Sequence, residues 1–179
     1  NITRVRDLCR SLGVPVIYSA QPGGQNREQR GLLFDFWGDG IGTEPHAAGI
    51  VEPIAPGDGD IMLRKWRYSA FHRTSLAGTL AGGDRTQLII CGVYAHIGCL
   101  MTATEAFSGD IQPFLVADAV ADFSADEHVQ ALQYVSGRCG VVLPARDCVD
   151  ALAAPPRLPD SLTALRRELA RAVELPLEA

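Results

Sequence analysis

A single lysine stands out among the basic residues of this chain. The sequence has sixteen lysines and arginines together, and Lys65 is the one lysine among them. Lysine differs from arginine because its ammonium is a compact charge whose pKa shifts readily on burial. Lys65 follows the apolar run Ile61–Leu63, which predicts an amine at the tip of a buried strand, where α/β folds place their ligands. The alternative is a surface lysine that compositional drift has spared.

Polar and aromatic residues follow two other apolar runs. Gln21 comes directly after one of these runs, and Tyr94 and His96 come after another. The C-terminal ends of parallel strands meet at one edge of a sheet, so we expect these side chains to gather near Lys65. Amide and cationic donors with aromatic walls suit a small, anionic ligand that contains a ring.

A long segment rich in glycine and proline, residues 21–60, carries further candidates. It contains Arg27, Arg30 and Trp37, which can fold over the same sheet edge. Long irregular segments in compact domains are often functional. Bland alternatives stay open here, because the two arginines flank Glu28 and could form a solvated charge cluster, while Trp37 could belong to the core.

The turn at residues 92–99 joins a predicted strand to a predicted helix. The backbone N–H groups of residues 97–99 should therefore point to the sheet edge that carries the candidates above. A thiol in this first helical turn could be an activated nucleophile, and Cys99 is the thiol present. His96 has no second histidine or carboxylate at ligand spacing, which favours a structural role over metal binding.

The hydrophobic pattern predicts an α/β protein of three layers, α/β/α, with a parallel sheet. Helices and strands alternate, which is typical of a sheet covered on both faces. The predicted strands cover residues 14–20, 60–65, 87–93, 112–116 and 140–143, and the predicted helices cover 1–12, 74–80, 97–107 and 125–137.

Composition narrows the classes of partner and compartment. The 179 residues fit one domain with a proper core, and the net charge of −5 argues against non-specific nucleic-acid binding. No apolar run reaches the roughly 18 residues that a membrane span needs. The five cysteines are odd in number and lie mostly in apolar segments, as free thiols do in a reducing compartment. We therefore expect a cytoplasmic protein with neither a nucleic-acid nor a membrane partner.

Several motifs, in one order, resemble the isochorismatase family. They are Ala-Gln-Pro-Gly at 20–23, Glu-Gln-Arg-Gly-Leu-Leu-Phe-Asp-Phe-Trp at 28–37, Arg-Lys-Trp-Arg-Tyr-Ser-Ala-Phe at 64–71, Gly-Val-Tyr-Ala-His-Ile-Gly-Cys at 92–99, Asp-Ile-Gln-Pro-Phe at 110–114 and Val-Ala-Asp-Ala-Val-Ala-Asp-Phe-Ser at 116–124. The resemblance runs from the first residues to about residue 150. It implies an isochorismatase-like, Rossmann-like fold with its first strand absent from this chain.

The resemblance also implies roles for individual residues. Lys65 would be the catalytic lysine, and the Val93–Tyr94 peptide bond would be cis. The related cysteine hydrolases carry their nucleophile at the position of Gly98, so Cys99 is one place off, which fits the branch without a covalent thiol. The substrate-binding residues that the resemblance implies are Gln21 and Arg30 for carboxylate or hydroxyl groups, Trp37 and Tyr94 for the pocket, and the Gly98 backbone.

The implied reaction is hydrolysis of the enolpyruvyl vinyl ether of isochorismate to pyruvate and 2,3-dihydro-2,3-dihydroxybenzoate, in siderophore biosynthesis, without metal or cofactor. The family's proton donor is an aspartate on a strand upstream of the first helix, so we expect this chain to begin after that strand and to be inactive as given. The closest alternative is hydrolysis of 2-amino-2-deoxyisochorismate in phenazine biosynthesis. A cysteine hydrolase that uses Cys99 and a non-catalytic module that docks a carrier domain are the remaining alternatives.

The C-terminal part predicts a change of organisation. We expect an isochorismatase-like hydrolase domain at 1–150, a proline-rich linker at 151–160, and the start of an aryl carrier domain or a tail helix at 161–179. A carrier domain would bear phosphopantetheine on a serine beyond Ala179. Expected partners are a small anionic substrate, a second copy of the chain, and components of a nonribosomal peptide synthetase.

Overall fold

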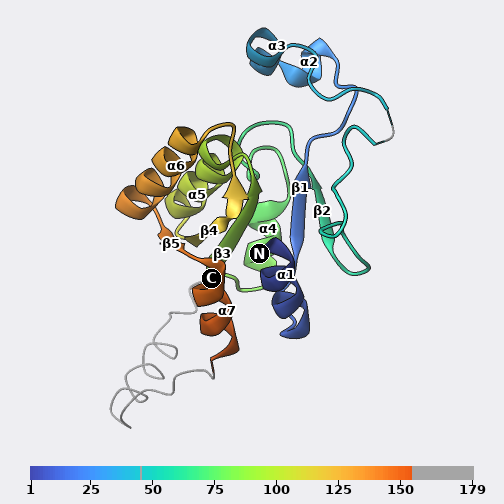
Figure 1. Ribbon diagram of the computed structural model, residues 1–179. Coiled ribbons are helices and arrows are strands. Elements are labelled where there is room, and N and C mark those ends of the chain that lie inside the picture. The colour runs from blue at the N-terminus through green and yellow to red at the C-terminus, as the bar shows by residue number, and fades with distance from the viewer. Residues whose placement is uncertain (45, 155–179) are drawn as a thin grey trace, which may run out of the picture.

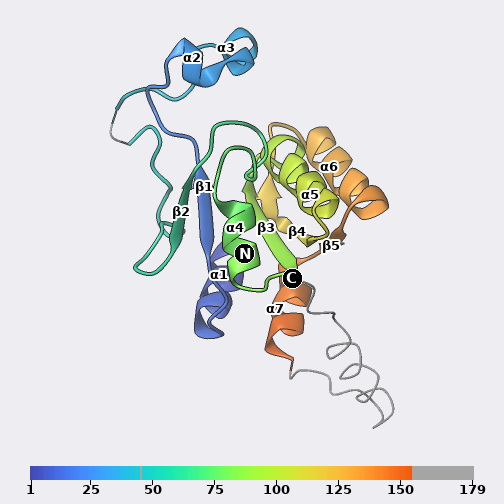
Figure 2. The same cartoon turned by 180° about the vertical axis from the view of Figure 1, so that it is seen from behind.

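The structure is a computed structural model that describes residues 1–44 and 46–154, drawn from two sides in Figures 1 and 2. Its strands are β1 (Ile17–Ala20), β2 (Ile61–Arg64), β3 (Gln87–Val93), β4 (Gln112–Ala121) and β5 (Val141–Leu143). Its helices are α1 (Ile2–Ser11), α2 (Arg27–Arg30), α3 (Leu32–Trp37), α4 (Leu76–Gly82), α5 (Leu100–Ser108), α6 (Ala125–Arg138) and α7 (Ala145–Ala153), with a π-helical turn, η1 (Ala95–Cys99), before α5. None of these helices is long and apolar enough to cross a bilayer.

All strand pairs are parallel, as the sequence predicts, but they form two sheets. β1 pairs with β2, while β3, β4 and β5 pair in that order. In both views β1 lies on the side of β3 that faces away from β4 (Figures 1 and 2). Within residues 1–44 and 46–154 no strand pairs with both β1 and β3. The single sheet that the sequence predicts is therefore present as two parallel blocks.

Helices cover both faces of the larger sheet. Neighbouring residues of β4 show this, because Leu115 and Val116 are both fully buried and successive strand residues point to opposite faces. Leu115 packs with α5 and α6, whereas Val116 packs with α1 and α7. A third cluster joins the two sheets, because Leu80 of α4 packs with Leu63 of β2 and Leu88 of β3. The three-layer α/β/α prediction is confirmed.

Several element boundaries need correction. The strand predicted from residue 14 begins at Ile17, and the strand predicted to end at 116 continues to Ala121 after an irregularity in its pairing with β3. Two short helices, α2 and α3, occupy part of the predicted loop 21–60. Helix α7 was missed, and its last residues include 151–153, which the sequence analysis gave to the linker. The rest of that linker from residue 155, and the helix predicted from residue 161, lie outside the described residues.

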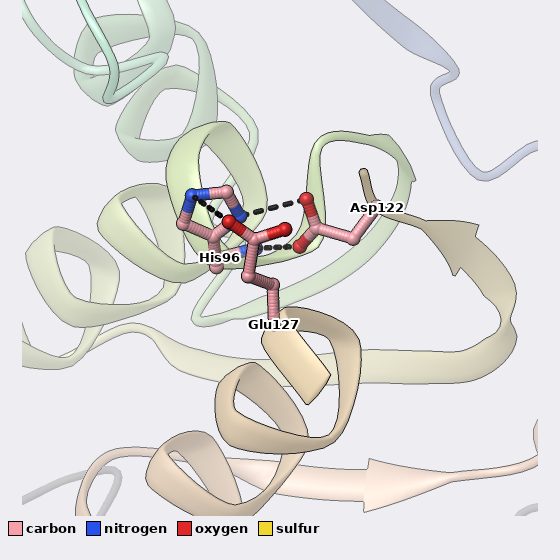
Figure 3. A group of neighbouring side chains, drawn as sticks. All are labelled: His96, Asp122 and Glu127. Atoms are coloured by element: carbon pink, nitrogen blue, oxygen red, sulfur yellow. Dashed lines mark hydrogen bonds and ion pairs between the residues drawn. The ribbon is translucent and has the colours of Figure 1, made fainter. Parts of the chain in front are cut away.

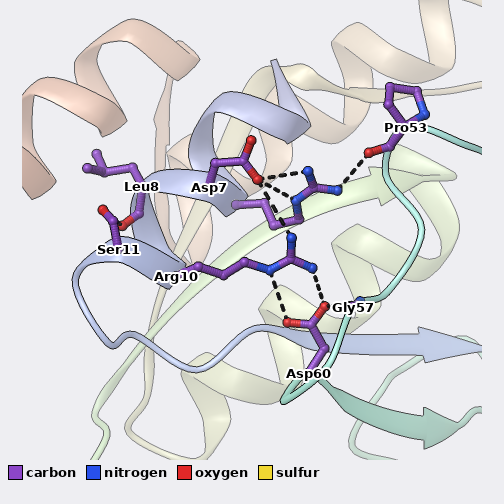
Figure 4. A network of polar contacts seen from close by, with 8 residues as sticks. Asp7, Leu8, Arg10, Ser11, Pro53, Gly57 and Asp60 are labelled. Carbon is purple, nitrogen blue, oxygen red and sulfur yellow. Dashed lines mark hydrogen bonds and ion pairs between the residues drawn. The ribbon is translucent and has the colours of Figure 1, made fainter.

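An ion pair ties α1 to the start of β2 (Figure 4). The guanidinium of Arg10 donates to both carboxylate oxygens of Asp60, and Asp60 also accepts the N–H of Gly57 at 2.8 Å. The side chain of Asp60 is only 4% exposed. The hydrogen bonds from Arg10 lower the pKa of Asp60 and outweigh burial, which acts in the opposite direction.

We expect Asp60→Asn to lower the unfolding temperature by several degrees at pH 7 and by much less at about pH 3. A carboxylate with a lowered pKa contributes stability above its ordinary pKa of about 3.9, and this contribution is lost as pH falls through the lowered value. Thermal unfolding at both pH values measures the effect. Asp7→Asn is the matched control, because Asp7 also contacts Arg10 but is 54% exposed. Equal shifts at the two pH values would contradict the assignment.

Candidate active site

Four chain segments bring residues of the candidate site to the C-terminal ends of the strands. Lys65 directly follows β2, Tyr94 directly follows β3, and Phe123 comes two residues after β4. Gln21 directly follows β1, and because Ala20 pairs with Arg64, the register places Gln21 beside Lys65. The sheet-edge cluster predicted from the sequence is therefore present for these residues.

The Lys65 side chain is half-buried, and its ammonium forms no ion pair with an acidic side chain among the described residues. Its Nζ donates to the carbonyl of Tyr68 at 3.2 Å, while its backbone N–H donates to Ala20 at 2.8 Å and extends the β1–β2 pairing. Burial lowers the pKa of Lys65, because it disfavours the ammonium. The ion pairs found across residues 1–44 and 46–154 do not include Lys65. This arrangement leaves an ammonium that can pair with an anionic ligand.

Gly98 lies against the lysine amine. A Cβ placed on Gly98 would be 2.7 Å from Lys65 Nζ, which is too close for an unmoved side chain. The hydroxyl of Thr102 donates to the Gly98 carbonyl at 2.6 Å and accepts the N–H of Ala70 at 3.0 Å. This buried hydroxyl therefore couples the π-helical turn to the segment that carries Lys65. A glycine at position 98 is what leaves room for the amine.

Cys99 is poorly suited to act as a nucleophile. It lies in the core cluster with Ile90 and Leu115 and is only 4% exposed. Burial raises the pKa of its thiol to about 12, although nearby Lys65 acts to lower it. The reactive form of cysteine is the thiolate, so a thiol with this pKa stays protonated and inert at neutral pH.

The rings of Tyr94, Phe123 and Trp37 form an aromatic wall, which contacts Tyr68 of the Lys65 motif through Trp37. The rings of Tyr94 and Phe123 stack with centroids 3.9 Å apart, and the Trp37 ring is 6.2 Å from that of Phe123. The indole N–H of Trp37 donates to the hydroxyl of Tyr68 at 2.9 Å. The rings of Trp37, Tyr94 and Phe123 are all partly exposed, so they can contact a ligand. Tyr68 and Phe123 were not predicted as site residues from the sequence, although Tyr68 belongs to the same motif as Lys65.

Arg30 is engaged elsewhere in this structure. It is 3% exposed, and its Nε donates to the carbonyl of Gly38 at 2.7 Å. Its guanidinium occupies the space beside Gly40, within the arm formed by α2 and α3 that projects from the strands (Figure 1). Arg27 likewise pairs with Asp35 in the same arm. Among the described residues, the contacts of these arginines do not reach Lys65, whereas Trp37 from the same arm contacts Tyr68, whose carbonyl accepts from the Lys65 amine.

His96 is surrounded by two carboxylates that come from distant parts of the sequence (Figure 3). Asp122 accepts from the His96 backbone N–H at 2.6 Å and contacts its ring Nδ1 at 2.7 Å, and Glu127 lies 3.8 Å from Nε2. Among the residues that the structure describes, these three form the one group of metal-ligating types. Both carboxylate oxygens of Asp122 already accept hydrogen bonds, and His96 Nδ1 is one of their partners. Within this group, only His96 Nε2 and Glu127 would then be left to bind a metal. Zinc sites usually supply three or four protein ligands.

Comparison with known sequences identifies the family. The family model for the isochorismatase domain matches residues 1–147. The chain belongs to the isochorismatase family. The cis peptide bond between Val93 and Tyr94 agrees with the resemblance drawn from the sequence.

Curated isochorismatase relatives share about half of their aligned residues with the chain. Identity is 51% over 152 residues with the isochorismatase of Bacillus subtilis (strain 168), a match that spans 85% of this chain and 49% of that protein. It is 50% over 149 residues with the phenazine biosynthesis protein PhzD of Pseudomonas fluorescens, or 83% of this chain and 72% of that protein. Enterobactin synthase component B of Escherichia coli (strain K12) is 49% identical over 166 residues, or 93% and 56%. The chain thus spans about half the length of two of these three relatives.

Solved structures of isochorismatase-like hydrolases share the fold. A cysteine hydrolase from Pseudomonas syringae pv. phaseolicola 1448A superposes with a TM-score of 0.78 at 21% identity, over 84% of this chain and 78% of that one. A nicotinamidase from Bacillus subtilis reaches 0.69 at 20% identity, over 79% and 82%. At this identity the likeness concerns the fold alone. The predicted isochorismatase-like, Rossmann-like architecture is confirmed, and the isochorismatase relatives support a hydrolase.

Proposed function

We propose that the chain is the hydrolase domain of an isochorismatase, which cleaves isochorismate to pyruvate and 2,3-dihydro-2,3-dihydroxybenzoate for siderophore biosynthesis. The observation that carries the proposal is the half-buried amine of Lys65, which faces Gly98 and is connected to the aromatic wall through Tyr68. Isochorismate has two carboxylates for the amine and a six-membered ring for the wall. Family membership supports the reaction class.

The reaction begins with proton transfer to carbon. A carboxylic acid protonates the methylene of the enolpyruvyl group, which leaves an oxocarbenium ion on the ether carbon. Water adds to that carbon and returns a proton to the carboxylate, and the resulting hemiketal collapses to pyruvate and the ring alcohol. Lys65 binds a substrate carboxylate and stabilises the negative charge that forms on the acid as its proton leaves. We assign this acid to the aspartate that the resemblance gives as the family's proton donor.

The assignment to a siderophore pathway depends on a smaller difference among the relatives than the assignment of the reaction does. The match to the enterobactin synthase component spans 166 residues, whereas the match to the phenazine protein spans 149. The longer match favours the two-domain, siderophore type, with a linker after about residue 150 and an aryl carrier domain after it. We extend the proposal to a phosphopantetheine group on that carrier, peptide synthetase components as partners, a homodimer, and a cytoplasmic location. The hydrolase domain itself is proposed to need no metal or cofactor.

A second candidate is hydrolysis of 2-amino-2-deoxyisochorismate, as in phenazine biosynthesis. It is favoured by the 50% identity to the phenazine protein and by the match to 72% of that protein's length. The two substrates differ only in the group at one ring position, so they make the same demands on Lys65 and on the aromatic wall.

The test offers both substrates separately to the complete protein that contains this chain and measures pyruvate release. We expect faster release from isochorismate, expressed as kcat/KM. Preference for the amino compound would move the protein to phenazine-type chemistry, and release from neither would overturn the enzyme proposal in favour of a docking module. Cys99→Ala is measured in parallel and is expected to keep full activity, because the thiol takes no part.

A further inference from the structure

The side chain of Asp122 is fully buried and holds two turns of the chain together. One oxygen accepts the backbone N–H of His96 at 2.6 Å, and the other contacts His96 Nδ1 at 2.7 Å and accepts the N–H of Phe123 at 2.9 Å. Burial alone would raise the pKa of Asp122, but these hydrogen bonds lower it below its ordinary value. A buried carboxylate is thus kept ionised by donors from both turns.

The same carboxylate contacts the two chain segments that carry the stacked rings of the aromatic wall. Phe123 is bonded to Asp122 through its own backbone N–H, and Tyr94 lies two residues before His96. The His96 ring also meets the Phe123 ring edge-on, with centroids 6.0 Å apart at 64°. Three kinds of contact therefore converge on the placement of Phe123 against Tyr94.

Asp118 on the same strand shows what a purely structural carboxylate looks like here. It accepts the N–H of Ala145 at 2.6 Å at the start of α7, and the Asn1 side chain donates to it at 2.9 Å. These contacts join α1, β4 and α7 and touch none of the aromatic rings. Asp122 likewise contacts a helical turn that is distant in the sequence, but it also contacts the ring of His96 and accepts the backbone N–H of Phe123, a residue of the wall.

We propose that Asp122 and His96 are positioning residues that hold Tyr94 and Phe123 as a rigid wall for the substrate ring. Asp122 orients the imidazole through Nδ1, and the imidazole supports Phe123 from its edge. Glu127 faces the remaining ring nitrogen at 3.8 Å and limits rotation of the imidazole. The wall is therefore set by a buried group that does not itself reach the ligand. The kinetic part of this inference rests on the proposed function.

The structural part is tested by NMR on the complete protein with labelled tyrosine, using Tyr94→Phe to assign the signal. Stacking on Phe123 shifts the ring protons of Tyr94 upfield. We expect Phe123→Leu and Asp122→Asn to abolish this shift and the matched control Asp118→Asn to keep it. An unchanged shift in folded Asp122→Asn would overturn the proposal. If that variant does not fold, His96→Phe replaces it, because it keeps the backbone N–H and an aromatic ring but removes the contacts of Nδ1 with Asp122 and of Nε2 with Glu127.

The kinetic part is a split between KM and kcat. The wall contacts the ring, which changes little between the ground state and the transition state, so its loss should remove uniform binding. We expect Asp122→Asn to raise KM for isochorismate by about tenfold with kcat within about twofold, a loss typical of one packing or stacking contact. A fall in kcat at constant KM would overturn the positioning role. If the wild-type protein releases no pyruvate, the proposed function fails, while the NMR result still decides the positioning of the wall.

Discussion

Replacing Lys65 with methionine is expected to lower kcat for pyruvate release from isochorismate by about a hundred- to a thousandfold, the usual cost of removing one preorganised electrostatic stabiliser. Methionine is close to lysine in length and shape but carries no charge. In the proposed mechanism the ammonium supports the charge that develops on the acid during carbon protonation, so kcat should fall more than KM rises. The measurement is coupled detection of pyruvate with the complete protein. Near-wild-type turnover would remove Lys65 from the mechanism.

Stability distinguishes this loss of activity from misfolding. Burial lowers the pKa of Lys65, which means that folding favours the neutral amine and that the charged form costs stability below the lowered pKa. This cost decreases as pH rises above the lowered pKa and vanishes at the ordinary pKa of lysine, about 10.4. Lys65→Met should therefore keep or raise the unfolding temperature at pH 7 while activity is lost. A variant that is both inactive and strongly destabilised would leave the mechanism without support from this experiment and count against the burial argument.

The pH profile gives a second signature of the same amine. If the ammonium is required, activity falls as pH rises through the lowered pKa of Lys65. The alkaline limb should then begin below the value of about 10.4 that an ordinary lysine would give. The residual activity of Lys65→Met should lack this limb.

The sequence predicts the elements best where local pattern decides them. The strand at residues 87–93 matches β3 residue for residue, because its apolar run ends at a sharp turn. β4 continues beyond the end predicted at residue 116. Asp118 lies within the strand, and its side chain accepts the N–H of Ala145 at the start of α7. Helix α7 was missed because the proline-rich stretch that follows it suggested a linker. Its apolar residues pack against α1, which is far away in the sequence, and against β4.

The candidate site likewise contains residues that the sequence predicts and residues that only the fold brings together. Lys65 is visible from the sequence because its residue type is unique in the chain, and Gly98 is visible through the family motif. The partners of His96 could not be found by spacing, because Asp122 is 26 residues away and meets it only through the parallel pairing of β3 and β4. Phe123 was passed over for the same reason. Arg30 was expected at the ligand from its charge, whereas the fold buries it against the backbone of its own arm.

Gly98 occupies the position at which the resemblance places the nucleophile of the cysteine hydrolases. Any side chain at this position would project toward Lys65 Nζ. In this chain the amine of Lys65 occupies the space that a side chain at position 98 would need. A residue with a Cβ and an amine in its present position cannot both be accommodated, because the two atoms would be 2.7 Å apart.

Gly98→Ala should consequently reduce kcat/KM for isochorismate by about ten- to a hundredfold, since small displacements of a positioned catalytic group carry penalties of this order. The unfolding temperature should change little, because the atom that must move is the free end of a flexible side chain. Gly137→Ala in α6 is the control, as its Cβ would meet nothing within 4 Å and alanine is a better helix former than glycine. Full activity in Gly98→Ala would show that the amine can act from another position. A large loss of stability would show instead that the glycine serves the turn and not the lysine.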